Sequence, residues 1–205
     1  ESEYVTKGTY KTQRIEHAFM ELECCVAKPQ EDGIEVFSQG QGVYEDRNSI
    51  SKILGIPLEN VVVSLMPNGG AFGGKEDISV QGHASLFAHL LQLPVRVALT
   101  RPESLLMHPK RHPMSMDISM GCDKNGKLTF IKADIIGDTG AYASVGMKVL
   151  ERAAGHATSV YTIPSVEILS RAVYTNNVPC GAMRGFGVNQ INFAVESCLD
   201  ELCEL

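Results

Sequence analysis

The feature that most constrains the fold is a glycine-rich segment at residues 67–75, Pro-Asn-Gly-Gly-Ala-Phe-Gly-Gly-Lys. It follows a β-branched apolar run at 61–66, which predicts a buried strand. Apolar residues at helical spacing over 76–93 then predict a helix. Because glycine has no Cβ, the backbone between strand and helix can approach a ligand closely and present N–H groups to it. A helix beginning directly after the loop would add partial positive charge and favour an anionic ligand.

The other segments predict a mixture of strands and helices. Hydrophobic patterning indicates strands at 34–38, 94–100 and 166–174, and helices at 45–54, 146–159 and from 188 onward. Met114, Met116, Ile118 and Met120 alternate with polar residues, as in a half-buried strand. This strand and a second one at 127–136 flank Asn125-Gly126, a hairpin signal. We therefore expect an α+β domain with mixed sheets and packed helices.

Composition excludes several classes of partner. Hydrophobic residues make up 44% of the chain and charged residues 20%, as in ordinary globular proteins. The net charge of −6 without a basic block argues against nucleic acid or an anionic membrane as the main partner. No apolar run reaches the roughly 20 residues of a membrane span. The cysteines form no C-x-x-C pair, which predicts free thiols in a reducing compartment, the cytoplasm. They lie at 24, 25, 122, 180, 198 and 203.

Both chain ends predict that the sequence is part of a longer polypeptide. The chain starts at Glu1 without a methionine, and an apolar stripe at helical spacing continues to its last residue. The stripe consists of Val188, Ile191, Val195, Cys198, Leu202 and Leu205. We expect residues 1–205 to form one domain fragment, in which a break near 110–120 would separate two subdomains.

The glycine-rich segment taken by itself leaves several interpretations open. Gly69, Gly74 and Lys75 match the phosphate-binding pattern G-x-x-x-x-G-K, but Glu76 occupies the position where a P-loop needs Ser or Thr to hold magnesium. The dinucleotide pattern G-x-G-x-x-G fails because Ala71 replaces its second glycine. A purely structural turn remains the third interpretation.

A family resemblance favours a cofactor-binding loop over the other interpretations. The string at 69–76, Gly-Gly-Ala-Phe-Gly-Gly-Lys-Glu, resembles the cofactor loop of the xanthine dehydrogenase family of molybdenum hydroxylases, which usually has a third glycine in place of Ala71. Four more segments resemble the family in chain order: Val-Phe-Ser-Gln-Gly-Gln at 36–41, Asp-Thr-Gly-Ala-Tyr at 138–142, Glu-Arg-Ala at 151–153 with Tyr-Thr-Ile-Pro at 161–164, and Met-Arg-Gly-Phe-Gly-Val-Asn-Gln at 183–190. The resemblance covers nearly the whole chain and is closest to the purine dehydrogenases.

The resemblance implies a molybdenum pyranopterin cofactor, either molybdopterin or its cytosine dinucleotide. Gln41, or less well Gln39, would hydrogen-bond an oxygen ligand of molybdenum. Phe72 and Arg184 would lie near the metal, largely through backbone groups, without being direct protein ligands. The implied cofactor-binding set is Gln41, Gly70, Ala71, Phe72, Gly73, Arg184 and Gly185. A solvated loop glutamine is the plainer interpretation of Gln41.

The resemblance also implies a substrate site. Phe186 would stack on an aromatic ring, and Glu76 and Arg152 would bind a purine or related N-heterocycle from opposite sides of a slot. Arg152 could also stabilise negative charge developing on a carbonyl oxygen. Plainer interpretations stay open, namely a core phenylalanine, a helix-capping Glu76 and a surface ion pair of Arg152. Gly185 argues against the carbon monoxide-oxidising branch, which has a copper-ligating cysteine there.

Further partners are expected outside this chain. By the resemblance, the general-base glutamate, the [2Fe–2S] clusters and FAD belong to other domains or subunits of an oligomeric enzyme, so the fragment alone should be inactive. Nicotinate or an aldehyde are alternative substrates, and a nucleotide-binding module or a non-catalytic scaffold are alternatives from other classes. His108 and His112 have an i,i+4 spacing, but the intervening Pro109-Lys110-Arg111 favours an exposed turn over a zinc site.

Overall fold

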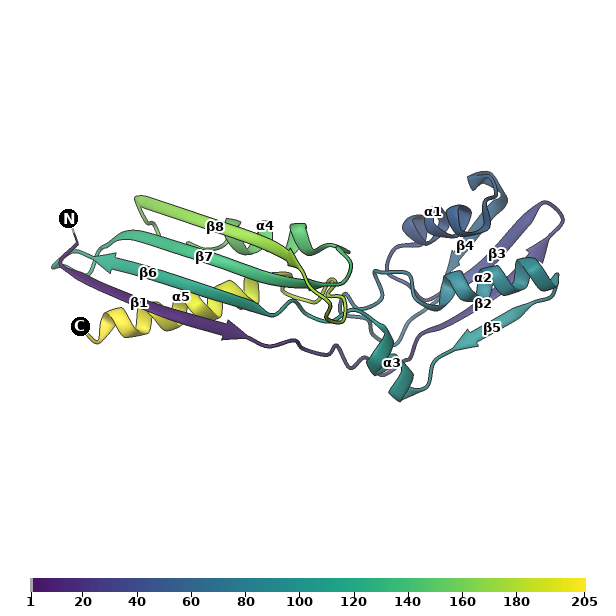
Figure 1. Cartoon of the computed structure of the whole chain (residues 1–205), viewed down its shortest axis with the longest axis horizontal. Helices are drawn as coiled ribbons and strands as arrows, with labels where there is room; N and C mark the ends of the chain where they lie inside the picture. The colour runs from purple at the N-terminus through teal and green to yellow at the C-terminus, as the bar shows by residue number, and fades with distance from the viewer. Residues whose placement is uncertain (1) are drawn as a thin grey trace. The chain divides into compact units, whose positions relative to one another are not determined.

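The computed structural model describes residues 2–205, and the chain divides into two compact units. We call Glu16–Pro109 the inserted unit, and Glu1–Ile15 together with Lys110–Leu205 the terminal unit. Within residues 2–205 each unit has a four-stranded sheet of its own (Figure 1).

The terminal unit is built on a sheet with strand order β1-β6-β7-β8. β1 (Tyr4–Thr12) pairs antiparallel with β6 (Met114–Cys122), which forms the predicted hairpin with β7 (Leu128–Gly140). β8 (Ser165–Tyr174) then pairs parallel with β7. The alternation predicted for β6 is confirmed, because its four apolar residues from Met114 to Met120 are at most 2% exposed.

Two helices pack on this sheet. α5 (Val188–Cys203) lies against β1 and β6, and α4 (Gly146–Gly155) lies against β7 and β8 (Figure 1). The stripe on α5 buries Ile191, Val195, Cys198 and Leu202 in the core, as its helical spacing predicts. Of the other two members, Val188 is half-buried at the start of the helix, and Leu205 lies beyond its end and is 65% exposed.

The inserted unit has strand order β4-β3-β2-β5. β3 (Gly33–Ser38) pairs antiparallel with β2 (Cys24–Gln30) and parallel with β4 (Val61–Leu65), and β2 also pairs antiparallel with β5 (Val95–Ala98). The parallel β3–β4 pair requires a crossover, which α1 (Val43–Leu54) and the 3₁₀ turn at Leu58–Asn60 supply. α1 is capped by Gly55 in the left-handed conformation, and it ends where the helix predicted over 45–54 ends.

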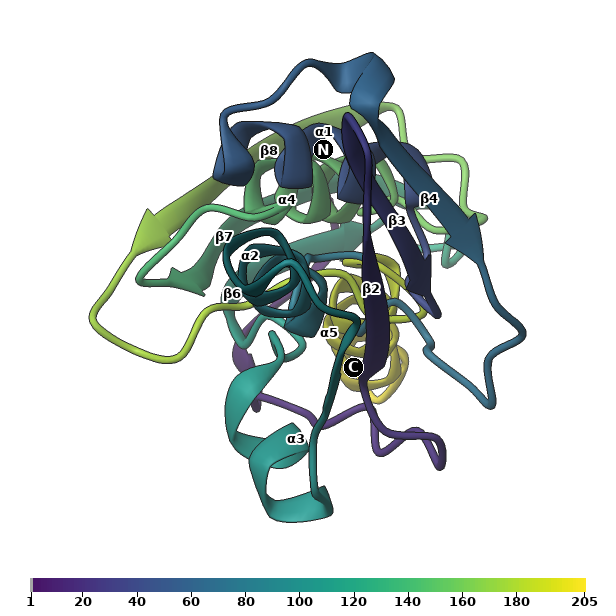
Figure 2. The same cartoon turned by 90° about the vertical axis from the view of Figure 1, so that its right-hand side faces the viewer.

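α2 (Val80–Leu91) follows the glycine-rich segment and packs on β2, β3 and β5, with α1 beside it on the same face (Figure 2). Its core-facing side consists of small residues, among them Ala84, Ser85 and Ala88, whereas Phe87 and Leu90 are at least 50% exposed. The short α3 (Arg101–Met107) then begins with a capping box between Thr100 and Glu103.

Two predicted helices are shorter in the structure. The helix expected over 76–93 begins at Val80, and the one expected over 146–159 ends at Gly155. Four residues therefore separate Lys75 from the first residue of α2, and the positive end of that helix does not begin directly after the loop. No helix among residues 2–205 has both the length and the apolar character of a membrane span.

Candidate functional site

The glycine-rich segment of the inserted unit forms a tight turn with unusual backbone angles. Gly70 and Gly73 have φ values of 107° and 97°, and Phe72 between them has φ 54°. A left-handed conformation is uncommon for a bulky residue and costs roughly 1–2 kcal/mol, so the surrounding contacts must enforce it. In the described part of the chain, no protein acceptor takes the N–H groups of Ala71 or Phe72. Two adjacent backbone donors of the turn are thus left without a protein acceptor within that part of the chain.

Three hydrogen bonds join Gln41 to this turn. Its Oε1 accepts the N–H of Gly73 at 2.9 Å and that of Lys75 at 3.3 Å, while its own backbone N–H donates to the carbonyl oxygen of Lys75 at 2.9 Å. Because the amide oxygen is engaged with the backbone, the Nε2 group is oriented as the donor for a ligand. Gln41 is exposed, but it is not a freely solvated loop residue.

A buried polar network positions the chain just before Gln41. Ser38 Oγ donates to Asp46 Oδ2 at 2.8 Å, and Gln81 Nε2 donates to Ser38 Oγ at 3.2 Å. Gly40 N–H donates to the same Ser38 oxygen at 3.0 Å. A Cβ on Gly40 would lie 2.8 Å from Asp46 Oδ2, so this position requires glycine. Burial raises the pKa of Asp46, although Ser38 and Gln81 work to lower it.

Lys75 lies inside the inserted unit. The side chain is 4% exposed, and its Nζ donates to the carbonyl oxygen of Glu21 at 2.9 Å and to Gln39 Oε1, and lies 4.7 Å from the centroid of the Phe19 ring. Burial lowers the pKa of Lys75, which Glu21 and Glu23 partly offset. A P-loop lysine must reach a bound phosphate. Since this one is engaged with protein acceptors and α2 begins further on, the P-loop interpretation is wrong.

Glu76 follows Lys75 and is exposed. It does not cap α2, whose N-cap residue is Ser79, so the capping interpretation is wrong. Partial desolvation, together with the neighbouring Asp77, raises the pKa of Glu76. No hydrogen bond or ion pair engages its carboxylate among the described residues. The carboxylate is therefore open to a ligand.

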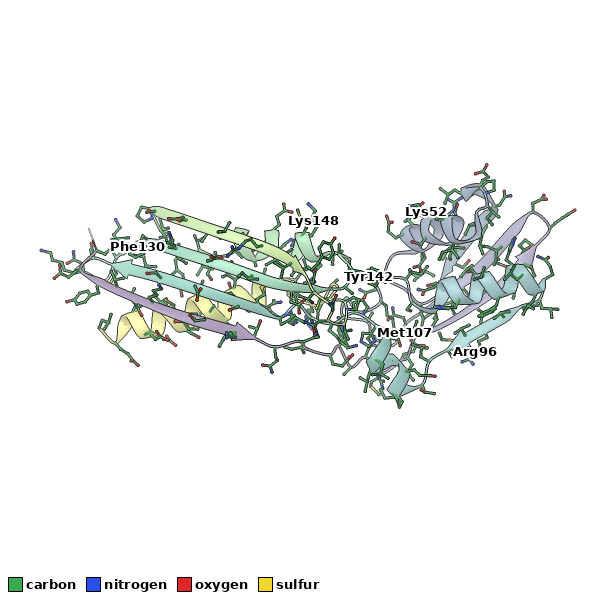
Figure 3. All side chains as sticks on the ribbon, in the orientation of Figure 1. Lys52, Arg96, Met107, Phe130, Tyr142 and Lys148 are labelled. Atoms are coloured by element: carbon green, nitrogen blue, oxygen red, sulfur yellow. The ribbon has the colours of Figure 1, made fainter. Side chains whose placement is uncertain are left out.

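In the terminal unit, Arg152 and Phe186 line one cavity of about 490 Å³. Arg152 projects from α4, and its Cζ lies 5.9 Å from the centroid of the Phe186 ring. Lys148, labelled in Figure 3, lines the same cavity and forms a 2.9 Å ion pair with Glu151. Arg152 itself has no such pair within the described chain, which argues against its interpretation as a surface ion-pair partner.

The loop that carries Phe186 is also held in a strained form. Phe186 has φ 41° between Gly185 at 95° and Gly187 at 93°. A Cβ on Gly187 would lie 2.2 Å from the carbonyl oxygen of Val149 on α4, so only glycine permits this approach. Phe186 is half-buried against the core of the terminal unit, which leaves part of its ring open.

Arg111 holds the same loop through a hydrogen bond to its backbone. Its Nη2 donates to the carbonyl oxygen of Arg184 at 2.6 Å, and Asn189 Nδ2 donates to that oxygen at 3.3 Å. Gly185 leaves the room that Asn189 occupies, since a Cβ there would lie 2.3 Å from the Asn189 side chain. Arg111 is 7% exposed, and burial lowers its pKa. The sequence interpretation missed Arg111, as it missed the internal position of Lys75.

The predicted site residues thus form two groups. The inserted unit brings Gln41 together with Gly73 and the turn from Gly70 to Phe72, with Glu76 shortly after it. The terminal unit brings Arg152 to Phe186 and holds Arg184 and Gly185 in the same loop. The pairing of Glu76 with Arg152 across a substrate slot joins one group to the other and stays a prediction. Gln39, the weaker choice for the cofactor, binds the Lys75 ammonium instead.

The segment from His108 to His112 is not the exposed turn that the sequence suggested. His108, His112 and Arg111 are 1%, 1% and 7% exposed, and Lys110 is 9% exposed. His108 belongs to the inserted unit and His112 to the terminal unit. The prediction of an exposed turn failed because polar residue types alone do not reveal contacts with residues that are distant in sequence. All six cysteines among the described residues are free thiols.

Comparison with known proteins identifies the family. The family model described as "Molybdopterin cofactor-binding domain" matches residues 1–205. The chain is 41% identical over 202 residues to a probable xanthine dehydrogenase subunit of Bacillus subtilis, and 37% identical over 201 residues to the nicotinate dehydrogenase large molybdopterin subunit of Eubacterium barkeri. Each alignment covers 98% of this chain, but 27% and 47% of those relatives.

A solved structure agrees with this relationship. The chain superposes on the aldehyde oxidoreductase from Desulfovibrio gigas with a TM-score of 0.95 and 27% identity, covering 99% of this chain and 22% of that one. The match extends over both sheets and their helices, so the predicted α+β class is confirmed. The chain belongs to the molybdopterin cofactor-binding domain family, and it spans about a quarter to a half of the length of the curated relatives named above.

Proposed function

We propose that this chain forms part of a molybdenum hydroxylase that oxidises a purine or related N-heterocycle, with oxygen derived from water. The molybdenum pyranopterin would supply the site of oxygen transfer and accept the electrons. The general base, the [2Fe–2S] clusters and FAD would belong to other domains or subunits of an oligomeric, cytoplasmic enzyme. The relatives are named as subunits and are longer than this chain, which leaves room for further parts of the enzyme outside it.

The residues of the inserted unit fit such a cofactor. A pyranopterin and its phosphate carry polar and anionic groups, which backbone N–H donors bind well. The turn presents the N–H groups of Ala71 and Phe72, and Gln41 presents Nε2 beside them. We assign the contact with an oxygen ligand of molybdenum to Gln41, and close backbone approach to Gly70, Ala71, Phe72 and Gly73. Arg184 and Gly185 would contribute from the loop of the terminal unit.

The substrate assignment depends mainly on the cavity beside α4. Its volume of about 490 Å³ is in the range of small-molecule sites. Phe186 offers an aromatic face and Arg152 a guanidinium near it, which together suit a flat ring with a carbonyl oxygen. Arg152 would bind that oxygen and stabilise negative charge developing on it. Glu76, whose pKa is raised, would accept or share a proton with a ring N–H.

A double substitution tests the substrate assignment. In the full-length polypeptide, Glu76→Val with Arg152→Met should abolish purine turnover while molybdenum and pterin contents stay at the wild-type level. Lys148→Met is the matched control, because Lys148 lines the same cavity without an assigned role in purine binding. Purine turnover that survives the double substitution would contradict the assignment. Loss of the cofactor from the variant would instead place Glu76 or Arg152 in cofactor binding.

Nicotinate is the second candidate substrate. Arg152 and Lys148 both line the cavity around Phe186, and cationic groups beside an aromatic ring suit an aromatic carboxylate. Glu151, the ion-pair partner of Lys148, lines the cavity as well. The 37% identity to a nicotinate dehydrogenase subunit supports the same choice. If nicotinate is the substrate, Lys148→Met should raise its KM, whereas the KM for a purine should not change in this variant. Turnover of both substrate classes by the wild-type enzyme separates the two candidates.

A further inference from the structure

A second polar cluster in the inserted unit lies outside the proposed cofactor site. It consists of Glu16, His17 and His108, each of which offers one ligand atom within 4.8 Å of the others. The two histidines are 7% and 1% exposed, and Glu16 is half-buried. Two imidazoles and a carboxylate form a donor set that binds zinc and similar divalent transition metals in proteins.

The contacts of His108 resemble those of a metal-binding histidine. Its Nε2 lies 2.6 Å from Glu16 Oε1, and its Nδ1 lies 2.9 Å from Glu23 Oε1. Glu23 is 2% exposed. A carboxylate on one ring nitrogen fixes the tautomer so that the other nitrogen can bind a metal, an arrangement common behind metal ligands.

The geometry requires a modest adjustment. Ligand atoms around tetrahedral zinc lie about 3.4 Å apart, given metal–ligand distances near 2.1 Å. The Glu16–His108 contact of 2.6 Å must therefore lengthen, and the widest separation in the cluster, at most 4.8 Å, must shorten. Glu16 is the most exposed of the three and the best able to move.

We propose that Glu16, His17 and His108 bind one zinc-class divalent metal ion, with Glu23 supporting His108 from behind. Glu16 and His17 are the first two residues of the inserted unit, and His108 is the last but one. The ion would thus join the two ends of this unit across 92 residues of sequence. The expected role is structural, because a link between distant positions restricts the unfolded chain most. This site is independent of the proposed hydroxylase function.

Zinc titration of the full-length polypeptide tests the proposal. After chelator treatment and dialysis, isothermal titration should give one high-affinity Zn²⁺ site. X-ray absorption at the zinc edge should show nitrogen and oxygen ligands without sulfur, which separates this site from adventitious binding by Cys24 or by the exposed Cys203. The zinc edge is distinct from that of molybdenum, so a cofactor-loaded sample can be used.

Substitutions assign the ligands. Glu16→Gln, the least disruptive change, and His17→Ala should each weaken binding at least about tenfold, and Glu23→Gln about 10–100-fold. His83→Ala is the matched control, because His83 is exposed on α2 and should leave the affinity unchanged. Circular dichroism identifies any variant that fails to fold. Absence of a stoichiometric site in the wild-type protein, zinc–sulfur scattering, or undiminished binding in the folded Glu16→Gln and His17→Ala variants would each overturn the proposal.

Discussion

Lys75→Met is the substitution that most directly tests how the glycine-rich turn keeps its shape. The Lys75 Nζ bond to the Glu21 carbonyl links the end of the turn to the segment that holds its start, because Glu21 Oε2 accepts the N–H of Gly69. The backbone of Lys75 also bonds Gln41 in both directions. Removing the ammonium should therefore loosen the whole segment from Gly69 to Lys75 while the sheet and helices remain folded.

The expected loss in the free energy of unfolding follows from the contacts that Lys75→Met removes and adds. Two charge-assisted hydrogen bonds contribute about 1.5–3 kcal/mol each, and the contact with Phe19 about 1 kcal/mol. The substitution also removes the desolvation cost of the buried ammonium, which is several kcal/mol. The methionine side chain fills a similar volume beside Phe19. The net loss in the free energy of unfolding should be about 1–2 kcal/mol, most of it local.

Hydrogen exchange is the appropriate assay. The amides of Gly73 and Lys75 are protected by Gln41 Oε1, and a local loss of about 1.4 kcal/mol corresponds to a tenfold faster exchange through local opening. Lys52→Met is the matched control, because Lys52 is exposed on α1 of the same unit (Figure 3). Unchanged exchange at Gly73 and Lys75 in Lys75→Met, or an equal change in Lys52→Met, would refute the reasoning.

Two further predictions concern backbone strain and pH. Gly187→Ala should destabilise the protein by about 2–4 kcal/mol, because φ is 93° and the new Cβ overlaps the Val149 carbonyl. Gly126→Ala is the control: φ is 77° there, but the space around the new Cβ is open, so the cost should be about 1 kcal/mol. Equal losses in denaturant unfolding would show that the contact with α4 is unimportant. Burial lowers the pKa of His112 from 6.5 to about 4, so the folded state binds fewer protons than the unfolded state between these values. Stability should fall by about 3 kcal/mol from this group as the pH drops from 6.5 to 4, and His112→Asn should remove that part of the pH dependence; an unchanged slope would contradict it.

Short-range signals predicted much of the fold. The Asn125-Gly126 hairpin, the end of α1 at Gly55 and the alternation in β6 depend on residues close in sequence, and all three are confirmed. β2 was missed because Pro29 disfavours a strand. The structure accommodates Pro29 because β5 pairs with β2 only as far as Ala27, so no partner on that side needs its missing N–H. β1 was missed because its partner β6 lies more than 100 residues further along the chain.

The side of α2 that faces the sheet could not be predicted from apolar spacing. The large residues Phe87 and Leu90 are at least 50% exposed, whereas the small residues Ala84 and Ala88 are fully buried. The same limit applies to the candidate site. Motif order located Gln41, Phe72 and Phe186, whereas the contacts that hold them come from Lys75 and Arg111, whose partners are distant in sequence.

The central claim is that this chain contributes to a molybdenum pyranopterin site. The most direct measurement is the molybdenum and pterin content of the native full-length protein, purified gently from cells supplied with molybdate. Metal analysis by mass spectrometry and fluorescence of the acid-oxidised pterin would be performed on one sample. The account predicts near-stoichiometric amounts of both. Absence of both would contradict it, and would favour a scaffold that keeps the fold of the family without its cofactor.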